Sequence, residues 1–147
     1  MNNKGVIVKL YYQLINSDGK VNEHEISLGK RMMEVEKISA ADFHFYLESI
    51  KKKELSVIYK ETLSDMRRLT PDQQIRCIAW LCVLANSDGF MDKAEWQFIY
   101  KIYHKELNLP LTDIMEVQKE LVKKLTVAPV SVEWTPPSTP SMSRMAS

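Results

Sequence analysis

The sequence has few of the residues and patterns that mark most enzymes. Its 147 residues include four glycines, two cysteines and three histidines. Because the glycines are not clustered, no Gly-rich loop is available to hold a phosphate. His24, His44 and His104 lack the spacing of a metal-ligand pair or of a nucleophile with its base. We therefore expect a non-enzymatic protein without an organic cofactor.

Charge of one sign and long apolar runs are also missing. The formal net charge is +1, and no Lys/Arg cluster is interleaved with aromatic residues, so nucleic acid is not an expected partner. No run approaches the ~20 apolar residues of a membrane span. The N-terminal apolar run is too short for a secretory signal, because Lys9 interrupts it. We expect a cytoplasmic protein whose partners are other proteins, and the sequence does not indicate its oligomeric state.

The two cysteines do not suggest a disulfide or a zinc site. Cys77 and Cys82 lie within one predicted helix and point well apart, at about 100° per residue. They are expected to be buried and reduced.

An apolar content of 45% and a charged content of 27% are typical of a soluble globular protein, and the length suggests one domain with a sizeable core.

Apolar residues at helical spacing predict an all-α fold. Seven helices are expected, at about 5–16, 22–37, 39–53, 54–69, 71–85, 92–106 and 112–125. The fifth is apolar nearly all round after Arg76, so it should be the central buried helix. Its start is marked by Thr70-Pro71-Asp72-Gln73, which is typical of a capping box with proline in the first turn.

The chain also contains an internal repeat. Asn16–Glu25, NSDGKVNEHE, returns as Asn86–Glu95, NSDGFMDKAE, and each copy lies between two predicted helices. The sequence therefore predicts two three-helix repeats, at about 4–52 and 71–125, related by a pseudo-twofold axis and joined by a linking helix. The helical domain spans residues 1–125, and the Pro/Ser-rich segment 126–147 is expected to be a flexible tail whose short apolar part ends at Trp134.

Helix capping is the simplest interpretation of these twin acidic turns. Asn22 and Asp92 each precede a Glu three residues later, which fits a cap residue with its reciprocal partner. Each cap would contribute ~1 kcal/mol. On this interpretation the protein is a metal-independent interaction scaffold.

A calcium loop is the second interpretation. With Gly19 or Gly89 at position 6 of the twelve-residue loop, Glu25 and Glu95 fall at position 12. Position 1, which is normally Asp, is then Leu14 or Leu84. The missing first ligand in both copies argues against an ordinary calcium loop.

A single site shared by the two turns is the third interpretation. Carboxylates that a pseudo-twofold axis brings together repel one another, and a hard divalent cation relieves that repulsion. The candidate metal ligands are Asp18, Glu25, Asp88 and Glu95, with Asn22 and Asp92 as secondary candidates. A metal-dependent hydrolase built on this cluster is a less favoured alternative.

The paired Asp-Gly-x-apolar-x-x-x-Glu turns, each between two helices, resemble the TerB-like tellurite-resistance family over roughly residues 4–125. The resemblance implies an all-helical fold with internal pseudo-symmetry and a role in tellurite and other chemical stress. It also implies divalent metal binding, of calcium or of magnesium or manganese, by Asp18, Glu25, Asp88 and Glu95. This chain departs from the family in having Asn-Ser before each Asp-Gly.

Overall fold

The computed structural model describes residues 4–17, 23–86 and 93–126. Every regular element in these ranges is a helix, which confirms the predicted all-α class. The elements are α1 (Lys4–Ile15), α2 (Glu23–Val35), α3 (Ala40–Lys51), α4 (Leu55–Arg67), α5 (Pro71–Ala85), α6 (Lys93–Tyr100), the π-helix η1 (Lys101–Glu106) and α7 (Leu111–Thr126). Thus α7 includes the first residue of the predicted tail, and the rest of that tail lies outside the described residues.

Helix α5 is the central element, as its sequence predicts. Its residues from Cys77 to Ala85 are all buried, and it contacts α1, α2, α6 and α7. The capping box is formed: Thr70 Oγ1 accepts from the Gln73 amide at 3.2 Å, and Gln73 Oε1 accepts from the Thr70 amide at 3.1 Å. Pro71 occupies the first turn, where its missing N–H costs no helical hydrogen bond.

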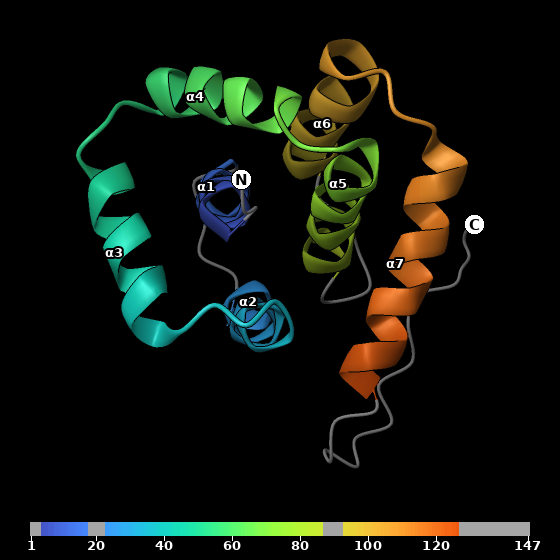
Figure 1. Cartoon of the computed structure of the whole chain (residues 1–147), viewed down its shortest axis with the longest axis horizontal. Coiled ribbons are helices and arrows are strands. Elements are labelled where there is room, and N and C mark those ends of the chain that lie inside the picture. The colour runs from blue at the N-terminus through green and yellow to red at the C-terminus, as the bar shows by residue number, and fades with distance from the viewer. Residues whose placement is uncertain (1–3, 18–22, 87–92, 127–147) are drawn as a thin grey trace.

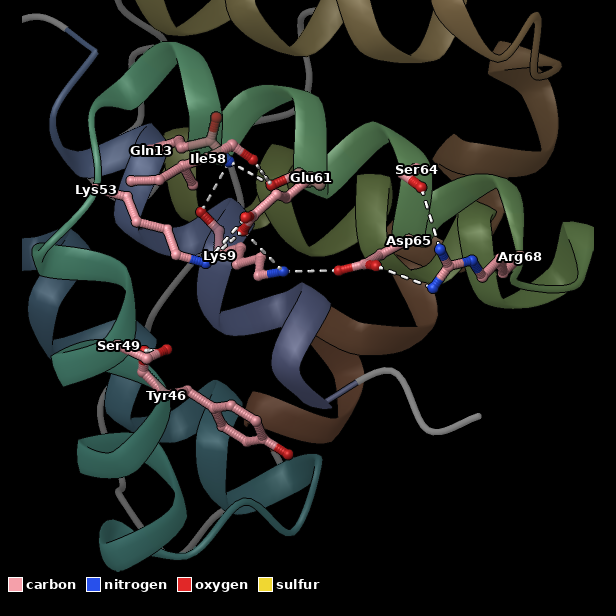
Figure 2. A network of polar contacts seen from close by, with 11 residues as sticks. Lys9, Gln13, Tyr46, Ser49, Lys53, Ile58, Glu61, Ser64, Asp65 and Arg68 are labelled. Carbon is pink, nitrogen blue, oxygen red and sulfur yellow. Dashed lines mark hydrogen bonds and ion pairs between the residues drawn. The ribbon is translucent and has the colours of Figure 1, made fainter.

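Helix α1 is the second inner element. It contacts α3, α4 and α5, and Figure 1 shows α2, α3 and α4 arranged around it. Between α1 and α4, Lys9 Nζ lies 2.7 Å from Asp65 Oδ2 (Figure 2). Gln13 Nε2 also donates to Thr62 Oγ1, at 2.9 Å. Because Gln13 and Thr62 are both buried, this satisfied polar pair fixes how the linking helix lies on α1.

The structure differs from the sequence-based expectation in the sixth predicted helix. The helix predicted at 92–106 continues only to Tyr100 as an α-helix and then becomes π-helical, with the Leu107 amide donating to the Ile102 carbonyl at 3.0 Å. The wider turn accompanies the burial of the adjacent Ile102 and Tyr103. Leu55 is the first residue of α4 and is half exposed, and Ile58 is the first residue of that helix to reach the core.

Candidate functional site

The closing glutamates of the two acidic turns occupy equivalent places in the structure. Glu25 is the third residue of α2 and Glu95 is the third residue of α6. Both are almost fully buried, with 1% of Glu25 and 4% of Glu95 exposed. The other candidate ligands, Asp18, Asn22, Asp88 and Asp92, lie outside the described residues. Burial is thus a property that both described candidates share.

The helix ends that lead into the turns are also alike. Asn16 Nδ2 donates to the Tyr12 carbonyl at 2.7 Å, and Asn86 Nδ2 donates to the Cys82 carbonyl at 3.1 Å. Each asparagine therefore closes the last turn of its helix with the same bond to the residue four positions earlier. The repeat seen in the sequence is reproduced in local structure here, while the pseudo-twofold relation of the halves stays a prediction.

The position that a calcium loop needs for its first ligand lies in the core in both copies. Leu14 and Leu84 are both 0% exposed and belong to the hydrophobic core. Neither offers an oxygen, and neither could be exchanged for Asp without placing a charge in the apolar interior. This placement favours a shared site or caps over two ordinary calcium loops.

Glu25 and Glu95 differ from an ordinary capping glutamate in being buried. The third residue of a helix is where a capping-box Glu stands, and the partial positive charge of the helix N-terminus favours a carboxylate there. That role needs no burial, whereas removing an ionised carboxylate from water costs several kcal/mol unless partners compensate. Two carboxylates buried at equivalent places are the donors that a hard cation prefers, so the residues fit such an ion.

Glu25 has an aromatic neighbour on α1. A Cβ placed on Gly29, one turn after Glu25, would lie 2.5 Å from Tyr11 Cε1 and 2.8 Å from the Tyr11 hydroxyl oxygen. The ring tip of Tyr11 therefore rests on the backbone of α2. Burial raises the pKa of Tyr11, and the negative charge of Glu25 raises it further. The hydroxyl consequently stays protonated near the carboxylate at neutral pH.

The second copy lacks this neighbour. Leu81 occupies the position equivalent to Tyr11, and Ile99 occupies the position equivalent to Gly29. Both are buried, at 1% and 0% exposure. In the second copy, Leu81 and Ile99 are both apolar. In the first copy, the equivalent pair, Tyr11 and Gly29, includes the Tyr11 hydroxyl. The twin-turn pattern does not reveal this difference, although an isolated glycine within a helix is the usual signal of a close approach.

Comparison with known proteins places the chain in a family. The sequence model described as tellurite resistance protein TerB matches residues 5–119. The chain belongs to the TerB family. Searches of curated proteins and of solved structures give no match. The match covers both acidic turns of this TerB-family chain and every described helix except the first residue of α1 and the end of α7.

The remaining candidates in this TerB-family chain are dispersed. His24, His44 and His104 are exposed, and His104 stacks on Tyr100 with ring centroids 4.7 Å apart. Within residues 4–17, 23–86 and 93–126, no three His, Cys, Asp or Glu side chains gather where they could hold a metal. Asp18, Asp88 and Asp92 lie outside these residues, so the predicted ligand set stays a prediction. None of the helices in the described part is long and apolar enough to cross a membrane.

Proposed function

We propose that this TerB-family protein is a non-enzymatic, cytoplasmic module of the tellurite and chemical stress response that binds a divalent cation. The ligands are Asp18 and Glu25 from one turn and Asp88 and Glu95 from the other. Calcium, magnesium or manganese is the ion, since each takes oxygen donors. The response to the ion is passed to protein partners.

The observation that carries the proposal is the equivalent burial of Glu25 and Glu95. Capping alone does not require that both residues be removed from water. In a low dielectric a cation interacts strongly with such carboxylates, and it offsets the cost of their burial. The family match to tellurite resistance protein TerB supports the link to tellurite.

Calorimetric titration of the full chain with calcium, magnesium and manganese tests the proposal. Wild type should bind at least one ion, and its melting temperature should rise with that ion and fall back with chelator. Asp18→Asn and Asp88→Asn should each weaken binding by about tenfold or more, because the charge of the ligand set controls affinity. Their effects should not add, since either loss empties the same site.

The matched control is Asp113→Asn. Asp113 is an exposed acid in the first turn of α7, outside the repeated turns, so its substitution should leave binding unchanged. Two independent binding events, each removed by one substitution, would contradict a shared site. Absence of binding at millimolar concentrations of all three ions would refute the proposal.

A scaffold whose turns only cap helices is the second candidate. It is favoured by the helix starts, since α2 begins at Glu23 and α6 at Lys93, directly after Asn22 and Asp92. In that case Asn22→Ala and Asp92→Ala should each cost ~1 kcal/mol of unfolding free energy, with or without metal. Screening the metal-loaded protein against phosphoesters and esters tests the absence of hydrolase activity.

A further inference from the structure

One side of α7 carries apolar residues that are not fully packed in the described part of the fold. Helix α7 packs chiefly on α5 and lies at the edge of the fold (Figure 1). Its core residues are all buried: Ile114, Leu121 and Leu125. Beside them, Leu111 and Met115 are 41% and 44% exposed, and Val122 is only partly buried. Because residues four and seven apart share one face of a helix, Leu111, Met115 and Val122 form one apolar surface, the outer stripe.

The C-terminal end of α7 is held in place. Arg31 Nη2 of α2 donates to the Leu125 carbonyl at 2.9 Å, and Leu125 is itself buried. This bond satisfies one of the carbonyls that a helix end leaves without an intrahelical partner. The chain therefore leaves α7 from a fixed point after Thr126, at the end of the outer stripe that is nearest to Val122.

The residues that follow have a sequence pattern that matches the outer stripe. Val130, Val132 and Trp134 alternate with Ser131 and Glu133. Alternation of this kind gives an extended segment one apolar edge. Prolines at positions 129 and 136 bound the run, and proline disfavours a continued helix. The pattern predicts a short extended segment over 130–134 with its apolar side chains on one edge.

The lengths of the segment and of the outer stripe also agree. Residues 127–129 are available for a reversal of the chain, within the usual connection length of about 2–6 residues. An extended chain covers about 13 Å from Val130 to Trp134, at about 3.3 Å per residue. Helix α7 covers about 11 Å from Val122 back to Met115 and about 17 Å back to Leu111, at about 1.5 Å per residue. A segment that turns back beside Val122 therefore brings Trp134 between Met115 and Leu111.

We propose that the segment Val130–Trp134 docks on the outer stripe, antiparallel to α7, with the Trp134 ring against Met115 and Leu111. A tryptophan ring gains much from burial, and a methionine sulfur makes favourable contacts with an aromatic ring. The predicted flexible tail then starts at Thr135. This inference goes beyond the proposed function and does not depend on the cation site.

The chain's own segment suits the outer stripe better than a second copy does. A stable interface between copies needs about 20–30 residues on each side, whereas the outer stripe offers three. A segment joined to the same helix by a short connection has an effective concentration of about millimolar, so that a small contact is enough to hold it. While docked, the segment covers the outer stripe, and another protein binds there only by displacing it.

Tryptophan fluorescence of the full chain tests the docking. The difference between the emission of wild type and that of Trp134→Phe isolates Trp134, because Trp80 and Trp96 contribute to both. The difference should be blue-shifted and weakly quenched by acrylamide, as for a ring removed from water. Met115→Lys places a charge in the docking surface. Measured in that background, the same difference should shift to the red, and its quenching should rise severalfold.

Thr112→Lys is the matched control. It adds the same charge at an exposed position of the same helix that lies off the outer stripe, so Trp134 should stay shielded. Helical circular dichroism checks that each variant is folded. Leu111→Lys takes the place of Met115→Lys if that variant does not fold, and it should expose Trp134 in the same way.

Three results would overturn the proposal. In the first, Trp134 of wild type is quenched as strongly as free tryptophan. In the second, the shielding persists in the folded variants of the outer stripe, which means that the ring packs elsewhere. In the third, the shielding is lost when the wild-type protein is diluted, which assigns the outer stripe to a second copy of the chain.

Discussion

Gly29→Ala is the perturbation for which the structure gives the clearest expectation. Gly29 is buried in the middle of α2, and an added Cβ would lie 2.5 Å from Tyr11 Cε1 and 2.7 Å from Tyr11 Cζ. Carbon atoms are in favourable contact at about 3.5–4.0 Å, so both distances are far inside the repulsive range. Because Phe43 packs against the Tyr11 ring, the ring cannot simply move away.

Two opposing effects set the size of the change. Alanine is better than glycine in a helix interior by about 1 kcal/mol. Overpacking a filled core costs about 1–3 kcal/mol, and a contact this short belongs near the upper end of that range. The net expectation is a loss of about 1–2 kcal/mol of unfolding free energy. For a chain of this size, the melting temperature should fall by about 2–8 °C.

Thermal and urea unfolding followed by helical circular dichroism measure this loss. Ser27→Ala is the control, because Ser27 is exposed on the same helix and gains only helix propensity. Adding Tyr11→Leu to Gly29→Ala should restore part of the loss, and a double-mutant cycle would show coupling between the two residues. If Gly29→Ala is as stable as Ser27→Ala, the close approach of α1 and α2 does not exist.

Two further predictions concern an alkaline titration and a helix end. Burial raises the pKa of the Cys82 thiol from 9.0 to about 12, so the folded state favours the protonated thiol. The stability that this group contributes is complete below pH 9 and is lost as the pH rises to about 12. Urea unfolding across this range should lose up to ~4 kcal/mol from this group, and Cys82→Ala should flatten the decline. Lys37 has φ of 60°, after the end of α2, where glycine is favoured. Lys37→Gly should raise the unfolding free energy by about 1 kcal/mol, and an unchanged melting temperature would contradict that assignment.

Most of the helical frame could be predicted because its signals are local. Thr70 and Gln73 form the predicted capping box. At the N-cap of α3, Ser39 Oγ likewise accepts from the Asp42 amide, at 3.0 Å. The apolar run of α5 also fixes its central place, since only full burial suits a helix apolar on all sides. The π-helix η1 could not be predicted, because its bonding depends on how Ile102 and Tyr103 pack in the core rather than on a sequence pattern.

The candidate site is harder to predict because one pattern serves two purposes. A Glu three residues after a cap residue is explained by local hydrogen bonding alone, so the sequence around Glu25 and Glu95 does not indicate how much water reaches them. That depends on tertiary packing, which involves helices from distant parts of the chain. The structure gives the solvent exposure of Glu25 and Glu95, and both residues are buried.

This burial also changes which substitutions are informative. A capping glutamate at the surface would tolerate Glu→Gln with little change, in the presence or absence of metal, because glutamine can make the same bond to the backbone. A buried carboxylate that holds a cation would lose metal-dependent stability with the same substitution, because the charge itself is what the ion requires. The difference between melting temperatures with metal and with chelator, compared for Glu25→Gln and Glu95→Gln, therefore isolates the part of each residue's role that local sequence cannot explain. If the two variants show the wild-type difference, the acidic turns are caps and the burial of their glutamates belongs to the core alone.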